Sequence, residues 1–292
     1  PAPVIGLAIK AKALADEDRL ATGLRRLQEE DRSVNVEHDD ETGQTVMRGL
    51  GETHLNVSIE KLCRKMGIEV ETEPERVRFR ETVTRPADAE GKHKKQSGGH
   101  GQFGDCWVQF EPLPKGAGFE FVDAIVGGVI PKTYIPAVEK GIVESAKKGV
   151  LAGFPTVDFR ATLDFGSFHA VDSSEMAFKV AGSLAFKKAV AEAKPVLLEP
   201  IMEVTVTTPD DYMGDIMGDL NGRRGRVLGM ENAGRYQQIK AQVPLAEFLT
   251  YAPDLRSMTG GRGIYSMKFS HYDEVPAQIA EKVIEGVKQA EE

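Results

Sequence analysis

Residues 33–50 read "SVNVEHDDETGQTVMRGL", two extended segments joined by a turn. "SVNVEHD" and "TVMRGL" have the character of strands, and "DETGQ" between them is typical of a hairpin turn. Apolar residues at helical spacing predict helices on either side of this hairpin, at 16–30 and at 52–66. Strands expected at 4–10 and 68–74 complete the order βαββαβ. This order predicts a split-βαβ, ferredoxin-like sandwich.

Residues 199–276 repeat this order of elements, although not its letters. The expected elements are a strand (200–209), a helix (210–221), a hairpin (225–244), a helix at the start of 245–259 and a strand (264–276). We therefore expect a second ferredoxin-like module over 199–274. The predicted fold class is α+β, with two such modules flanking a middle domain.

The middle segment, residues 75–198, has a different pattern. Its expected elements are a strand (75–84), a loop (91–104), strands (106–112 and 119–128), a helix (132–148) and a strand (154–166). A short loop then leads to a helix that we expect Asp172 to cap, with Glu175 three places on completing a capping box. An amphipathic helix over 275–290 ends the chain.

Composition limits the classes of function. A length of 292 residues suits two or three domains. The net charge of −8 argues against bulk attraction to nucleic acid but allows a local basic surface. No apolar run reaches the roughly 18–20 residues of a membrane helix, and "PAPVIGLAIK" lacks a signal peptide, so we expect a cytoplasmic protein or a fragment of one. Cys63 and Cys106 lack ligand-spaced partners, which predicts neither a disulfide framework nor a zinc site.

Residues 98–104, "GGHGQFG", contain the dinucleotide-binding spacing Gly99-x-Gly101-x-x-Gly104. That fingerprint needs a strand before it and a helix after it, whereas polar "EGKHKKQS" precedes it and strand-like "DCWVQFEP" follows, so we reject nucleotide binding here. The loop carries Lys92, His93, Lys94, Lys95 and His100 with no acidic residue. Two interpretations stay open: a solvated hairpin end, or an RNA contact in which lysines hold phosphates and glycines admit close main-chain approach. Phe103 would stack on a base or pack internally.

Two further groups of residues are candidate sites. His169 lies just before a helix N-terminus, where anions are favoured, although a lone loop histidine is also a common surface residue. Arg223 and Arg224 follow a helix, where cations stabilise the helix end. No Ser or Cys pairs with His169 as in a hydrolase, and no Walker motif occurs. We therefore expect no catalytic residue and no bound GTP or ATP in this chain.

The sequence closely resembles the C-terminal part of bacterial elongation factor G. The matching runs include "DETGQTVMRGLGETHL", "KKQSGGHGQFG", "DSSEMAFKVAGSLAFKKA" and "VPLAEFLTYAPDLRSMTGGRGIYSMKFSHY", and they span nearly all 292 residues in order. The resemblance implies domain III over 1–74 and domain V over 199–274. It implies an arm, domain IV, over 75–198 plus 275–292, with a ribosomal protein S5 domain 2-like fold on which the last helix packs.

The resemblance further implies a ribosome-binding, monomeric portion of a translational GTPase that promotes tRNA–mRNA translocation at the decoding site. GTP and Mg²⁺ would be bound by a GTPase domain that this chain lacks. The terminal domain would contact rRNA of the large subunit, with Arg223 and Arg224 as the candidate contacts. The residues that match the RNA-binding tip of the arm are Lys94, Lys95, Gln96, Ser97, Gly98, Gly99, His100, Gly101, Gln102, Phe103, His169 and Asp172.

Two positions depart from the family pattern. Thr53 stands where an apolar residue is expected, and Asp105–Cys106 follow the tip where the housekeeping factor tends to be basic or apolar. We therefore expect a paralogous branch. Two alternatives stay open: a paralogue acting in ribosome recycling, and a free-standing RNA-binding protein.

Overall fold

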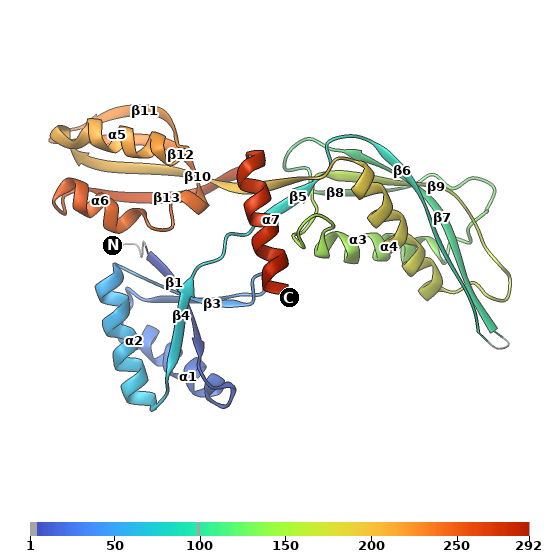
Figure 1. Cartoon of the computed structure of the whole chain (residues 1–292), viewed down its shortest axis with the longest axis horizontal. Coiled ribbons are helices and arrows are strands. Elements are labelled where there is room, and N and C mark those ends of the chain that lie inside the picture. The colour runs from blue at the N-terminus through green and yellow to red at the C-terminus, as the bar shows by residue number, and fades with distance from the viewer. Residues whose placement is uncertain (1–4, 98–99, 292) are drawn as a thin grey trace. The chain divides into compact units, whose positions relative to one another are not determined.

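The computed structural model describes residues 5–97 and 100–291 (Figure 1). Its contacts divide the chain into two compact units, Pro1–Arg78 with Pro200–His271, and Phe79–Glu199 with Tyr272–Glu292. Within the described ranges, none of the helices is both long and apolar enough to cross a membrane. The division into three domains with the bounds given above stays a prediction.

The N-terminal module is a four-stranded sheet in the order β2-β3-β1-β4 with two helices packed on it. Its elements are β1 (Ile5–Ala11), α1 (Glu17–Glu30), β2 (Asn35–Asp39), β3 (Gln44–Gly49), α2 (Glu52–Met66) and β4 (Val70–Pro74). Leu24 of α1 and Leu55 of α2 share a buried core with Ile9 and Met47 of the sheet. Gly67 ends α2 in the left-handed conformation, which a glycine adopts without steric cost. The predicted order βαββαβ is confirmed.

The carboxylate of Asp31 connects the end of α1 to the start of α2. It accepts hydrogen bonds from the hydroxyl and the N–H of Ser33 and from Nε2 of His54, the last at 2.9 Å. Nδ1 of His54 accepts from the N–H of Leu50 at 3.1 Å, so the ring carries its proton at Nε2. His54 is therefore a structural residue.

The pKa of Asp31 predicts how this module responds to acid. The Ser33 hydroxyl, followed by His54, lowers that pKa to about 2. An unfolded Asp titrates at about pH 3.9. The stabilisation from this carboxylate is therefore present above that pH and is lost as the pH falls toward 2. We expect Ser33→Ala to raise the pKa of Asp31 and to move this loss of stability to higher pH. An NMR titration of the carboxyl carbon that still gave about 2 in the variant would contradict the assignment.

The C-terminal module repeats the N-terminal one. Its sheet has the order β11-β12-β10-β13, which is the same order when each module's strands are counted from its own first strand. Its elements are β10 (Val196–Pro209), α5 (Met213–Gly222), β11 (Arg226–Ala233), β12 (Tyr236–Pro244), α6 (Tyr251–Thr259) and β13 (Ile264–Glu274), and α7 (Ala277–Glu291) follows. The repeat predicted from element order is confirmed, and the α+β class with it.

One helix of this module begins later than predicted. The sequence placed a helix at the start of 245–259, but Leu245–Glu247 form only a 3₁₀ turn and α6 begins at Tyr251. Pro253 explains the shift, because a proline lacks the N–H that a helix interior uses and fits only the first turn.

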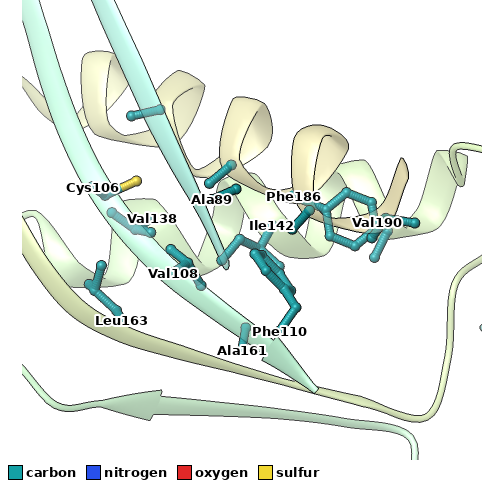
Figure 2. Close-up of a cluster of buried hydrophobic side chains, with 14 of the residues drawn as sticks. Ala89, Cys106, Val108, Phe110, Val138, Ile142, Ala161, Leu163, Phe186 and Val190 are labelled. Carbon is teal, nitrogen blue, oxygen red and sulfur yellow. The ribbon is translucent and has the colours of Figure 1, made fainter. Parts of the chain in front are cut away.

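The middle domain is a sheet in the order β6-β7-β9-β8, with β8 parallel to β9. Its elements are β5 (Arg80–Thr82), β6 (Ala87–Ser97), β7 (His100–Pro112), β8 (Phe119–Asp123), α3 (Ile135–Lys148), β9 (Phe159–Ser167) and α4 (Glu175–Glu192). Both helices cover one face of this sheet. Figure 2 shows part of the core that they share with the sheet: Ile142 of α3 and Phe186 of α4 lie beside Phe110 of β7.

Two sequence predictions for this domain are wrong. The strand expected over 75–84 is limited to β5, which pairs with residues 196–198 of β10 and not with the middle sheet. The loop expected over 91–104 is the outer half of a β6–β7 hairpin that runs beyond the ends of α3 and α4 (Figure 1). The sequence does not alternate between apolar and polar residues here, because the outermost positions of the hairpin have no hydrophobic core to face. Cross-strand hydrogen bonds hold it instead.

Candidate nucleic-acid interface

The ribbon, defined as residues 92–97 of β6 and 100–105 of β7, forms the outer end of the middle domain. Its pairing runs from Lys92 opposite Asp105 to Ser97 opposite His100. Of the predicted tip residues, Gly98 and Gly99 lie outside the described residues, as do the side chains of Ser97 and His100. A strand rather than a helix follows the glycine motif, so the context for a dinucleotide site is missing here.

Glycines in and beside the ribbon serve close packing within the chain. A Cβ on Gly91 would come within 1.9 Å of the carbonyl oxygen of Ala181, and one on Gly104 within 2.5 Å of that of Ala177. Both carbonyls belong to α4, so glycine lets this helix lie directly on the two strands. A Cβ on Gly101 would meet the carboxylate of Asp172 at 2.8 Å.

The tip loop, residues 168–174, is hydrogen-bonded to the start of β7. The N–H of Gly101 donates to Oδ1 of Asp172 at 3.0 Å, and the N–H of Phe103 donates to the carbonyl of Asp172 at 2.8 Å. The hydroxyl of Ser173 donates to the carbonyl of Phe103 at 2.9 Å and accepts from the N–H of His169 at the same distance. The structure therefore brings together the two segments that the sequence singled out separately.

The sequence predicted that Asp172 caps α4, and this prediction is wrong. The N-cap is Ser174, whose hydroxyl accepts from the N–H of Ala177 at 3.1 Å. The carboxylate of Asp172 turns instead toward Gly101. Asp and Ser are both favoured at a helix N-cap, and Glu175 three places after Asp172 made Asp172 the better match in sequence. The contact with β7 engages Asp172 instead and leaves the cap to Ser174.

Nδ1 of the His169 ring is held by hydrogen bonds, and the opposite edge of the ring is exposed. Nδ1 accepts from the N–H of Val171 at 3.3 Å and of Asp172 at 3.1 Å, which assigns the ring proton to Nε2. The contact of Nδ1 with Oδ2 of Asp172 at 3.4 Å is therefore between neighbours and is not an ion pair. The side chain is 54% exposed, so its Nε2–H can donate to a ligand.

Cations on the ribbon differ in what they contact. Lys92 lies 3.4 Å from Glu90 and 3.7 Å from Asp105, and Asp105, with Glu90, raises the pKa of Lys92. Lys94 and Lys95 are exposed and form no ion pair with any residue in the described ranges. Gln96 and Gln102 are exposed as well, and Oε1 of Gln102 accepts from Nε2 of His93 at 2.8 Å. Phe103 is half-buried.

The two arginines of the terminal module form contacts within that module. Arg223 pairs with Asp219 at 2.8 Å and with Asp254 at 2.5 Å, and its guanidinium lies 5.1 Å from the ring centroid of Tyr251. Arg224 pairs with Glu247 at 3.1 Å. These contacts favour the structural interpretation of both arginines, and their contact with RNA stays a prediction.

Models of three elongation factor G domains match consecutive parts of the chain. "Elongation Factor G, domain III" matches residues 1–74, "Elongation factor G, domain IV" residues 75–194 and "Elongation factor G C-terminus" residues 196–283. The chain belongs to the elongation factor G family. A crystal structure of a protein from Thermus thermophilus is 48% identical, with a TM-score of 0.89 over 99% of this chain. This chain spans 43% of the length of that Thermus chain.

The positions that depart from the family pattern lie in different surroundings. Thr53 is exposed in the first turn of α2, so a polar residue there costs no core contact. Asp105 and Cys106 are buried at the base of the ribbon. Oδ2 of Asp105 accepts from the hydroxyl of Ser167 at 2.6 Å, and burial raises the pKa of the Cys106 thiol to about 12.

Sequence reasoning missed the residues that hold the tip together. Ser173 connects His169 to Phe103, and Ser167 connects the start of the tip loop to Asp105. It also missed the exposed apolar side chains of Phe168 and Val171. The only signal was the cluster of small polar residues in "HAVDSS", which is common to many loops.

Proposed function

We propose that this chain is the ribosome-binding C-terminal portion of a cytoplasmic, monomeric translational GTPase that promotes tRNA–mRNA translocation. The ribbon and the tip loop would contact RNA at the decoding site, and the chain would act through contact and position, without covalent chemistry of its own. The proposal rests on the family and on the tip. Its most important support is that hydrogen bonds hold the tip loop against β7, so that Lys94, Lys95 and His169 are presented together at one end of the domain.

Charge distribution supports RNA as the ligand of this end. Residues 75–198 carry 17 Lys and Arg against 15 Asp and Glu, whereas the whole chain carries 37 against 45. Screening limits electrostatic attraction to about 8–10 Å, so exposed lysines at the ribbon act on phosphates despite the acidic remainder.

GTP and Mg²⁺ are the cofactors that the family implies. Within residues 5–97 and 100–291, no cluster of His, Cys, Asp and Glu could hold a metal ion, and the sequence has no Walker motif. The residues described here therefore do not fit these groups. We propose that a GTPase domain outside this chain binds both, and we derive no step of hydrolysis from the present residues.

The ribbon lysines provide a test of RNA contact. We expect Lys94→Gln and Lys95→Gln each to weaken binding of the chain to ribosomes carrying tRNA and mRNA. Each should also reduce the slope of log affinity against log salt by about one unit, because each lysine releases one phosphate counterion. A salt series with labelled chain measures this slope. Lys140→Gln makes the same change at an exposed position of α3 and should leave the slope unchanged. A slope equal to wild type in both ribbon variants would contradict the proposal.

A further inference from the structure

An aromatic pair is exposed on the face of the middle sheet that α3 and α4 do not cover. Trp107 of β7 is 41% exposed and Phe165 of β9 is 54% exposed. The two residues are directly opposite in register, so their side chains are neighbours on one face. Val122 of β8 is also exposed and lies on the same face. Contiguous exposed apolar side chains on a soluble domain commonly mark an interaction surface.

Carboxylates of β6 lie beside Trp107. Glu90 of β6 is directly opposite Trp107, and Asp88 lies two residues further along the same face. Lys92 is the nearest cation of β6 on this face, but it contacts Glu90 at 3.4 Å and Asp105 at 3.7 Å, so its charge is already balanced. Lys188 of α4 is a second cation here, and its Nζ donates to the carbonyl of Glu90 at 3.2 Å. The three carboxylates of Glu90, Asp88 and Asp105 still exceed these two cations, so the local charge beside Trp107 is negative.

The carboxylate excess continues away from the ribbon. Arg160 of β9 lies between Glu111 and Glu120, with nitrogen–oxygen distances of 2.5 and 2.7 Å, which leaves one net negative charge in that group. Phosphodiesters would be repelled from such a face. Two interactions attract a cation to this surface: aromatic rings attract it to their faces, and carboxylates attract it by charge.

We propose that the face formed by Trp107, Phe165, Glu90 and Asp88 binds an arginine-rich segment of a partner protein. A guanidinium would lie on the indole of Trp107 while Glu90 and Asp88 pair with neighbouring cations of the segment. Arginine fits better than lysine, because its planar and weakly hydrated guanidinium stacks on aromatic faces. This inference goes beyond the proposed function. The ribbon and the tip loop would contact RNA, whereas this face would bind a basic protein, and the two contacts do not depend on each other.

Trp107 is the only tryptophan of the chain, so tryptophan fluorescence reports binding at this site. We expect deca-arginine to quench the tryptophan fluorescence of the full 292-residue chain saturably. Deca-lysine should require a concentration about two- to fivefold higher for the same effect. Oligouridylate should leave the fluorescence unchanged even where it binds the ribbon. Quenching by oligouridylate and not by deca-arginine would overturn the proposal, since the face would then bind RNA.

Variants separate recognition from general charge attraction. Anisotropy of labelled deca-arginine should show affinity reduced about two- to fivefold by Trp107→Leu and by Glu90→Gln. Glu192→Gln removes the same charge from an exposed position at the end of α4 and should leave the affinity unchanged. Equal losses in Glu90→Gln and Glu192→Gln would overturn the proposal, and so would an absence of quenching in the wild-type chain.

Discussion

We expect Glu81→Gln to lower the free energy of unfolding of the middle domain by about 4 kcal/mol. Glu81 is fully buried in β5. Its Oε2 accepts from the N–H groups of Val150 and Leu151 at 2.7 and 2.9 Å, and its Oε1 from those of Ala152 and Phe154 at 2.7 and 3.1 Å. A glutamine would point its NH₂ group at two of these donors, whichever way the amide turns. Two buried N–H groups would then lose their acceptor, and the others would lose a charged one.

The measurement is urea unfolding followed by tryptophan fluorescence. Because the only tryptophan lies in β7, the signal reports the middle domain alone. Glu192→Gln serves as the matched control and should change the free energy of unfolding by less than about 0.5 kcal/mol. If Glu81→Gln unfolded at the wild-type urea concentration, the buried carboxylate would not be what holds the loop at 149–154.

The sequence was informative where a local pattern determines the structure. Both βαββαβ modules were predicted because turn residues, helical spacing and the stop at Gly67 act over a few positions. The hairpin over 91–104 was missed because its two strands are held by each other. Its glycines at 91 and 104 face residues of α4 that lie 90 and 73 positions later in the chain. The periodicity of apolar residues in the sequence carries no information about contacts between such distant positions.

The candidate site, too, could be predicted from the sequence only where a local pattern reveals it. Lys94 and Lys95 are recognisable from charge alone, and both are exposed as expected. The role of Asp172 was assigned wrongly, because its partner Gly101 is 71 positions away and a helix cap was the nearest local explanation. Glu81 gave no sequence signal, since its four donors are backbone groups of a loop about 70 residues distant.

We expect His169→Ala in the full-length factor to slow tRNA–mRNA movement on the order of tenfold, because contact geometry at the tip is lost. Ribosome-stimulated GTP hydrolysis should change little, since we propose that a GTPase domain outside this chain binds the nucleotide. Stability should also change by less than about 0.5 kcal/mol, as is usual for an exposed loop residue. The alanine removes two features, however: the exposed Nε2–H and the Nδ1 acceptor for the N–H groups of Val171 and Asp172.

His169→Asn separates these two features. Oδ1 of asparagine can accept from the N–H groups two and three residues on, as Asx turns do, so it preserves the loop while removing the outer edge of the ring. If His169 serves only the shape of the loop, asparagine restores the wild-type rate. If it contacts RNA, both variants remain slow.

The central claim, that this tip contacts tRNA–mRNA, is tested most directly by single-turnover translocation measured beside GTP hydrolysis on the same ribosomes. If the tip contacts tRNA–mRNA, His169→Ala and His169→Asn both slow translocation while hydrolysis keeps its wild-type rate. Wild-type translocation in both variants, or hydrolysis falling in step with translocation, would contradict it.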